Sequence, residues 1–245
     1  MKKRVDVLLV EKKLVETRAK AQAKIMAGQV SANGKIIKKS GEILNYNSVI
    51  VVSKLHPDWV SRGAYKLIHA IKTFNIEIKN KKCLDIGAST GGFSQVLLKY
   101  GAKKIYSVDV GKNQIHEKLL KEKKIINLEK TNARYLDHEI IFDTIDLIVC
   151  DVSFISMKKV LIPCFSFLNK KNGTIIGLIK PQFEAKKNEI KRGGIVSNSL
   201  IHRRICEDFQ NWFSKKYNMN ILGITQSPIK GPKGNIEFLI GAKIN

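Results

Sequence analysis

Cysteine is scarce in this sequence, and its few copies are scattered. They are Cys83, Cys150, Cys164 and Cys206, each in an apolar stretch and none in a C-x-x-C pair. Zinc sites and disulfide frameworks both depend on closely spaced or paired cysteines. We therefore expect four buried free thiols, no bound metal and a reducing, cytoplasmic environment.

Long hydrophobic runs are also lacking. The longest, such as VLIPCFSFL at 160–168, fall well short of the roughly 20 apolar residues that span a membrane. The first residues, MKKRVDVLLVEKK, combine a basic end with a short apolar stretch and further charge, which is not the pattern of a secretion signal. The sequence thus predicts a soluble, cytoplasmic protein with no membrane partner.

Acidic residues are few relative to basic ones. The chain has 21 Asp and Glu against 44 Lys and Arg, which gives a formal net charge of +23. Such a surplus favours a polyanionic partner, because each neutralised phosphate releases counterions. A Lys- and Asn-rich proteome is the alternative explanation. Hydrophobic residues still form 44% of the 245 residues, which is enough to bury a core.

The amino-terminal part of the chain has the pattern of a small separate module. Apolar residues at helical spacing over 5–9 predict a first helix, and Thr17 is a suitable N-cap for a second. VSANGKI at 30–36 predicts two strands joined by an Asn-Gly turn, and 49–52 predicts another strand. Pro57 favours an extended linker. We expect a module over 1–58 and a linker over 59–63.

This module resembles the S4 RNA-binding domain, which is named after a ribosomal protein. The runs RVDVLLVEKKLVETRAKAQ and IMAGQVSANGK carry the resemblance, which covers nearly all of the first 55 residues. It implies an RNA-facing surface formed by Arg4, Arg18, Lys20, Gln22, Lys24 and Lys35. A solvated basic helix surface without a ligand is the alternative reading of the same charges.

The remaining residues, 64–245, alternate between strand and helix patterns. The predicted strands are 82–86, 104–109, 125–128, 145–150, 173–179, 219–225 and 236–242. The predicted helices are 62–74, 93–100, 113–121, 157–167 and one within 198–216. This alternation predicts an α/β fold with a doubly wound, Rossmann-like sheet. The last two strands have no helix between them, which predicts a terminal β-hairpin.

A glycine-rich loop follows the first of these strands and opens a helix. Its spacing from Gly87 is G-x-x-x-G-G, and not the G-x-G-x-x-G of dinucleotide-binding proteins. Such a loop has room for an amino-acid tail and a sugar without a pyrophosphate. Asp85 is placed to accept a bond from a cationic amine, and Asp109 ends the next strand, where a ribose diol is held. An ordinary tight turn is the alternative.

The segment DIGASTGGF resembles motif one of the S-adenosylmethionine-dependent methyltransferases. The resemblance implies S-adenosyl-L-methionine as the cofactor, and Asn132-Ala133-Arg134 lies where that fold contacts adenine. The cofactor-binding residues that follow are Asp85, Gly87, Ala88, Ser89, Gly91, Gly92, Phe93, Asp109, Asn132 and Ala133.

Four charged residues fall at positions typical of catalytic groups. Asp151 and Lys180 each end a predicted strand, Glu237 begins the last one, and Lys66 lies in the helix that opens the catalytic part. Ligands of open α/β sheets bind beyond the carboxyl ends of the strands. We therefore expect Asp151 and Lys180 to meet near the transferred methyl group. A purely structural ion pair between them is the alternative.

Taken together, five segments resemble the TlyA family of bacterial ribosomal RNA cytidine 2′-O-methyltransferases, historically labelled hemolysins. They are SRGAYKL, DIGASTGGF, DVSFIS, KPQFE and GNIEF. The family implies an FtsJ-like catalytic domain whose Lys-Asp-Lys-Glu tetrad is Lys66, Asp151, Lys180 and Glu237. It also implies ribosomal RNA or a ribosomal subunit as the partner, with no obligate protein partner. The short chain favours 23S over 16S rRNA.

Three other functions compete with this interpretation. A base methyltransferase is the nearest, but no N-P-P-Y-like strand end occurs. A non-catalytic RNA-binding or ribosome-assembly protein and a cytolysin are the others. The sequence leaves open whether Lys180 acts as a neutral base or as a charged group that orients the hydroxyl.

Overall fold

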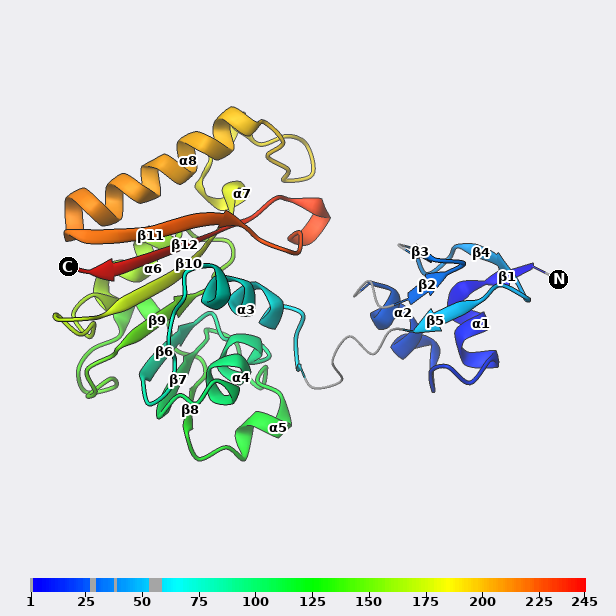
Figure 1. Ribbon diagram of the computed structural model, residues 1–245, viewed down its shortest axis with the longest axis horizontal. Coiled ribbons are helices and arrows are strands. Elements are labelled where there is room, and N and C mark those ends of the chain that lie inside the picture. The colour runs from blue at the N-terminus through cyan, green and yellow to red at the C-terminus, as the bar shows by residue number, and fades with distance from the viewer. Residues whose placement is uncertain (1, 27–29, 38, 53–58) are drawn as a thin grey trace. The chain divides into compact units, whose positions relative to one another are not determined.

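The chain folds into two compact units, Met1–Trp59 and Val60–Asn245 (Figure 1). The computed structural model describes residues 2–26, 30–37, 39–52 and 59–245. The expected module boundary at residue 58 and the predicted role of Pro57 lie outside the described residues. Within them, no helix is both long and apolar enough to cross a lipid bilayer.

The first unit is a small α+β domain. Its elements are β1 (Lys2–Arg4), α1 (Val5–Glu11), α2 (Arg18–Met26), β2 (Val30–Ala32), β3 (Lys35–Ile36), β4 (Ile43–Asn45) and β5 (Ile50–Val52). The Thr17 hydroxyl accepts a bond from the Lys20 backbone N–H at 3.2 Å, as an N-cap does. Both helices pack on the β2–β5 strand pair through buried aliphatic residues such as Leu9, Ile25 and Val30.

The second unit is built on a seven-stranded sheet. Its strands are β6 (Lys82–Ile86), β7 (Lys104–Val108), β8 (Ile125–Leu128), β9 (Leu147–Cys150), β10 (Thr174–Ile179), β11 (Met219–Gln226) and β12 (Phe238–Ile244). They lie in the order β11-β12-β10-β9-β6-β7-β8. Neighbours from β10 to β8 run parallel, while β12 is antiparallel to both β10 and β11. The doubly wound sheet and its closing hairpin are therefore confirmed.

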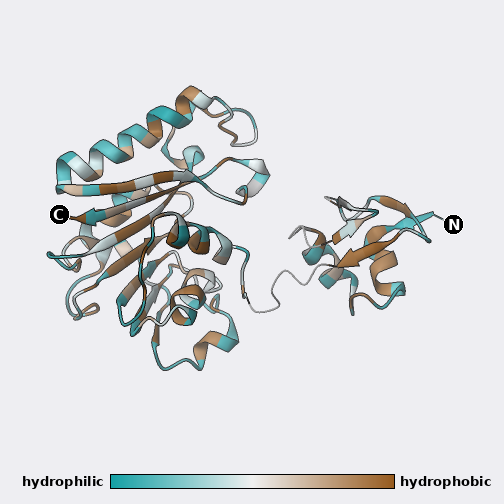
Figure 2. Cartoon of the chain, in the orientation of Figure 1, coloured by the Kyte–Doolittle hydropathy of each residue, from teal (hydrophilic) through white to brown (hydrophobic). Residues whose placement is uncertain are grey.

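Helices cover both faces of this sheet. They are α3 (Ala64–Thr73), α4 (Gly92–Lys99), α5 (Glu117–Leu120), α6 (Met157–Cys164), α7 (Pro181–Glu184) and α8 (Ser199–Asn211). Along β6, Leu84 and Ile86 belong to the core cluster that includes residues of α6 and α8. The residue between them, Asp85, is bonded to Ser94 of α4 and so points to the other face. Figure 2 shows the apolar residues concentrated along the central strands.

Two predicted helices differ from the structure. The helix predicted over 113–121 is wrong in its first half, because Asn113 takes a positive φ of 53° and α5 begins only at Glu117. The helix predicted within 198–216 ends as an α-helix at Asn211 and continues as a π-helical turn over Trp212–Lys216. All four cysteines are free, but Cys206 is half-buried rather than buried.

Candidate active site

The glycine-rich loop between β6 and α4 forms the floor of the site. Gly87 has a φ of +81°, and a Cβ there would lie 2.5 Å from the carbonyl oxygen of Asp151. A side chain would therefore clash with the end of β9 as well as adopt a conformation that L-residues rarely take. Gly91 precedes α4 at φ +90°. The loop backbone can thus lie flat beneath a ligand.

Two adjoining cavities open over this loop. The larger, of about 430 Å³, is lined in part by Gly87, Ser89, Asp109, Asn132 and Ala133. The smaller, of about 220 Å³, is lined in part by Lys66, Ala88, Gly92, Phe93 and Lys180. Gly87, Ser89, Asp151 and Ser153 line both. The structure therefore brings most of the residues expected to bind the cofactor next to those expected to be catalytic.

Asp109 lies directly after β7 and joins two loops that border the larger cavity. Its Oδ2 accepts a bond from the Ser89 backbone N–H at 2.8 Å, and its Oδ1 accepts one from the Gly111 N–H at 2.8 Å. Asn132 acts in a similar way, because its side chain caps the turn over Ala133–Tyr135 by accepting from the Arg134 N–H at 3.1 Å. Both side chains are fixed at the rim of the cavity.

Asp85 lies beneath the loop rather than in either cavity. Its side chain is fully buried, and its Oδ2 accepts a bond of 2.6 Å from the Ser94 hydroxyl, which is itself 2.6 Å from Ser107 Oγ. The other carboxylate oxygen has no partner among the described residues. Burial raises the pKa of Asp85 to about 7. Gly91 does not line either cavity.

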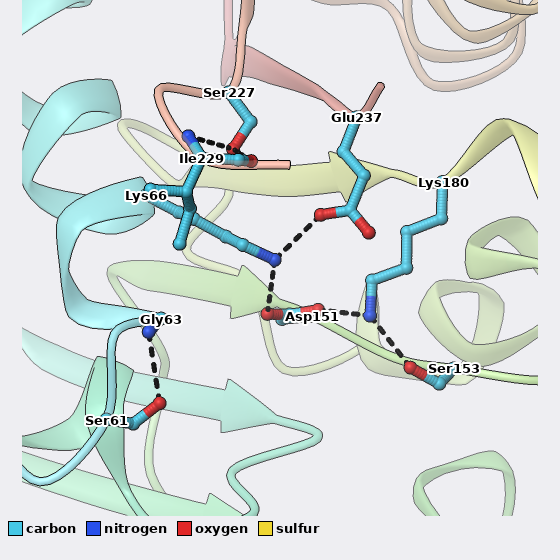
Figure 3. Close-up of polar contacts among 9 residues, drawn as sticks. All are labelled: Ser61, Gly63, Lys66, Asp151, Ser153, Lys180, Ser227, Ile229 and Glu237. Atoms are coloured by element: carbon cyan, nitrogen blue, oxygen red, sulfur yellow. Dashed lines mark hydrogen bonds and ion pairs between the residues drawn. The ribbon is translucent and has the colours of Figure 1, made fainter. Parts of the chain in front are cut away.

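The side chains of Lys66, Asp151, Lys180 and Glu237, here called the tetrad, meet at the carboxyl end of the sheet (Figure 3). Lys66 comes from α3, while Asp151 and Lys180 follow β9 and β10 and Glu237 precedes β12. The three strands are neighbours in the sheet, so its register places these residues side by side.

The contacts within the tetrad alternate in charge. Lys66 Nζ lies 2.7 Å from Glu237 Oε2 and 3.7 Å from Asp151 Oδ2. Lys180 Nζ lies 2.6 Å from Asp151 Oδ1. The four side chains are between 0% and 19% exposed. Two cations and two anions thus balance in a nearly buried cluster, in which each buried charge has a partner.

Ser153 is a site residue that the sequence interpretation missed. Lys180 Nζ donates a hydrogen bond of 2.8 Å to Ser153 Oγ (Figure 3), and Ser153 lines both cavities. Its position two residues after Asp151, within DVSFIS, was the available signal. Glu237 is the most deeply buried member of the tetrad, and its Oε1 has no partner among the described residues.

The residues expected to face RNA lie in the first unit, and their side chains differ in exposure and in the partners that they contact. Arg4, Arg18 and Gln22 converge on one buried carboxylate, that of Asp6. Lys20 is exposed and pairs with Glu16. Lys24 is half-buried on α2, and the side chain of Lys35 lies outside the described part of the chain.

Comparison with known proteins agrees with this architecture. The model of the FtsJ-like methyltransferases matches residues 59–244, and that of the S4 domain matches residues 3–50. A solved structure labelled as a hemolysin, from Streptococcus thermophilus, superposes with a TM-score of 0.75 at 38% identity, covering 99% of this chain and 88% of that one. Fold and site together define an S-adenosylmethionine-dependent methyltransferase fold joined to an S4 domain.

Two full-length relatives narrow the family. The 16S/23S rRNA (cytidine-2′-O)-methyltransferase TlyA of Mycobacterium tuberculosis is 37% identical over 238 residues, covering 97% of this chain and 88% of the relative. The 23S rRNA (cytidine-2′-O)-methyltransferase TlyA of Campylobacter jejuni is 37% identical over 248 residues, covering 94% and 95%. The chain belongs to the TlyA family of FtsJ-like methyltransferases.

Proposed function

We propose that this protein transfers a methyl group from S-adenosyl-L-methionine to the 2′-hydroxyl of a cytidine in ribosomal RNA. The observation that carries the proposal is the convergence of the tetrad beside the glycine-rich loop. Both TlyA relatives are named for this reaction. The S4 domain and the net charge of +23 support RNA as the substrate class.

The loop region fits the cofactor. A side chain at Gly87 would fill the floor of the cavities, and the Asp109 carboxylate borders the larger one, where it can accept bonds from a ribose diol. Asn132 and Ala133 border the same cavity as candidates for the adenine contact. When bound, S-adenosyl-L-methionine supplies an electrophilic methyl group on a sulfonium.

Lys180 is the group that we assign to the acceptor hydroxyl. An ammonium has three N–H donors; Ser153 accepts one of them, and Asp151 Oδ1 lies 2.6 Å away as the ion-pair partner. A donor is left to hold the ribose oxygen and to stabilise negative charge as the O–H bond breaks. Asp151, the carboxylate paired with Lys180 at 2.6 Å, would take the proton that leaves the hydroxyl directly.

The other two members of the tetrad position Asp151. Lys66 contacts Asp151 Oδ2 and is itself fixed by Glu237 Oε2. This arrangement leaves Asp151 Oδ1 facing Lys180. Because the four side chains depend on one another, we expect losses from single substitutions that do not add. By fixing Lys180 and Asp151, the tetrad would hold the acceptor hydroxyl in one orientation, which contributes to the rate.

The large ribosomal subunit is the favoured substrate. The C. jejuni relative is named for 23S rRNA alone, and the M. tuberculosis relative for 16S and 23S rRNA. The 23S rRNA is thus the target that the names of these two relatives share.

The test is a methyl-transfer assay with purified protein, tritiated S-adenosyl-L-methionine and separated 50S and 30S subunits. We expect label in 23S rRNA, at a nucleotide that resists alkaline cleavage on its 3′ side. A 2′-O-methyl group removes the oxygen that alkali needs as a nucleophile, whereas a methyl group on the base leaves it in place.

The Lys180→Ala variant is the control for this assay. It should bind cofactor and RNA but transfer little label. Label at an alkali-sensitive nucleotide would contradict ribose methylation, and label in 16S rRNA alone would contradict the 23S assignment. Tight RNA binding without any turnover would instead indicate a non-catalytic RNA-binding protein.

A further inference from the structure

The S4 domain contains a buried carboxylate that none of the expected RNA contacts explains. Asp6 lies in the first turn of α1, and its side chain is 0% exposed. A buried carboxylate is costly unless other groups neutralise and bond it. Its partners therefore show what this position is built to hold.

Donors from β1 and from α2 converge on Asp6. Arg4 forms a fork, with Nε donating to Oδ1 at 3.0 Å and Nη2 donating to Oδ2 at 3.0 Å. From α2, Arg18 Nη2 and Gln22 Nε2 donate to the same Oδ2 at 3.0 and 3.1 Å. The Arg4 guanidinium holds the pKa of Asp6 far below its usual range. Asp6 is thus ionised and fully bonded.

The two arginines are only partly used by this carboxylate. Their side chains are 47% and 57% exposed, although their shared partner is inaccessible. Asp6 accepts from Nε and Nη2 of Arg4 and from Nη2 of Arg18, and a guanidinium has five N–H donors. Two positive charges against one negative leave a surplus of one, which balances one phosphodiester.

We propose that Asp6 is a positioning residue that holds Arg4 and Arg18 as a preformed clamp for one backbone phosphate of the RNA. The proposal rests on the proposed function, since it takes RNA as the ligand of this domain. A guanidinium fixed in advance loses less rotamer freedom when it binds a phosphate than a free surface arginine does. Gln22 completes the support through its own bond to Asp6 Oδ2.

Removal of the Asp6 charge distinguishes the clamp from RNA binding through the total charge of the domain. Asp6→Asn raises the net charge by one, so a domain that binds RNA only through its total charge would bind more tightly. A clamp that needs Asp6 would bind more weakly despite the added charge. Binding by total charge and binding by the clamp therefore predict opposite changes in the RNA affinity of Asp6→Asn.

Glu16→Gln is the matched control. Glu16 belongs to the same domain and pairs with Lys20 in an exposed i,i+4 contact. Its substitution changes the net charge by the same amount as Asp6→Asn and leaves Arg4 and Arg18 untouched. Any difference between the two variants therefore reports position rather than charge.

The experiment measures binding of the full chain to a labelled rRNA stem-loop by fluorescence anisotropy over a salt series. For Asp6→Asn we expect affinity to fall about tenfold and the slope of log K against log salt to become shallower by about one, as for a lost phosphate contact. Glu16→Gln should bind as tightly as the unsubstituted chain or more tightly. Equal affinities for the two variants would overturn the proposal.

A second variant tests the clamp while leaving the buried Asp6 in place, so that a loss of binding is not caused by unfolding around Asp6. Arg4→Lys combined with Arg18→Lys keeps the net charge and changes two exposed side chains, but removes both guanidinium groups. It should also bind about tenfold more weakly, and unchanged binding would overturn the clamp. Methyl transfer at saturating RNA is the separate readout. An inactive wild-type chain would contradict the proposed function, while the binding comparison would still decide the role of Asp6.

Discussion

At the scale of single residues, Lys180 is held by two different acceptors. A carboxylate oxygen of Asp151 lies 2.6 Å from its amine and the Ser153 hydroxyl lies 2.8 Å away. We expect Lys180→Ala to lower the single-turnover rate on ribosomal subunits by about 10²–10⁴-fold, the range of lost proton-transfer or charge stabilisation. Cofactor and RNA binding should be unchanged, because the amine is paired with Asp151 and Ser153 and not with the residues expected to bind the cofactor.

Lys180→Arg distinguishes the two roles of this amine. Arginine remains charged and can stabilise an oxyanion, but it cannot act as a neutral base. Measurable turnover by Lys180→Arg, well above that of Lys180→Ala, supports a charged orienting group. Loss as complete as in Lys180→Ala, in a variant that still binds cofactor, supports the base. Retention of more than about a tenth of the rate by Lys180→Ala itself, a smaller loss than either role implies, would show that the tetrad is misassigned.

Asp109 carries a second residue-scale prediction. Its carboxylate bonds the backbone N–H groups of Ser89 and Gly111 and borders the larger cavity. Asp109→Ala should weaken S-adenosyl-L-methionine binding by about 1–3 kcal/mol, since it leaves partners unsatisfied. Calorimetric titration of the folded variant gives the dissociation constant. A constant equal to that of the wild type would show that Asp109 is not the ribose ligand.

At the scale of elements, the junction of β6 and α4 contains a carboxylate that is buried without a cation. Burial raises the pKa of Asp85 to about 7 in the folded chain, against about 4 in an unfolded one. At pH values between these two pKa values, Asp85 holds a proton in the folded state that it has released in the unfolded state. The free energy of unfolding should therefore fall as pH rises from about 4 to about 7. Asp85→Asn should make this fall smaller.

Denaturant unfolding at a series of pH values, without cofactor, measures the effect. Asp6 does not interfere, because its pKa is lowered and its contribution is lost only as pH falls below the usual range of Asp. Parallel curves for the wild type and Asp85→Asn across the window would mean that Asp85 does not titrate there.

The elements also show which parts of the fold could be predicted from the sequence. The apolar patterns over 145–150 and 173–179 predicted the buried parallel strands, and the charged residues after them predicted two members of the tetrad, because strand ends share one edge of the sheet. β1 was missed, because its sequence, KKR, has no apolar alternation and pairs only with the distant β4. The Asp6 cluster was missed for a similar reason, since a charged residue in a short helix is ordinarily exposed.

At the scale of the whole molecule, the positive charge is divided between the two units. Residues 1–58 contain 12 Lys and Arg against 5 Asp and Glu, a surplus of seven, so the remainder of the chain carries a surplus of 16. Charge alone would therefore leave most of the RNA affinity with the catalytic unit. The S4 domain adds a defined arrangement of arginines, which charge counting does not capture.

Removal of residues 1–58 tests this division. The main core cluster of the catalytic unit contains no residue before Leu84, and the Val60 N–H keeps its bond of 2.7 Å to the Gln95 side chain. We expect residues 59–245 to remain folded and to bind S-adenosyl-L-methionine as the full chain does. RNA binding should persist at low salt through the 16 surplus charges but be lost at moderate salt, because each missing phosphate contact lowers affinity and makes its salt dependence shallower. Calorimetry with the cofactor and anisotropy with an rRNA stem-loop measure the two effects. Equal RNA affinity of the shortened and full-length chains at moderate salt would mean that the catalytic unit alone recognises the substrate and that the S4 domain serves another purpose.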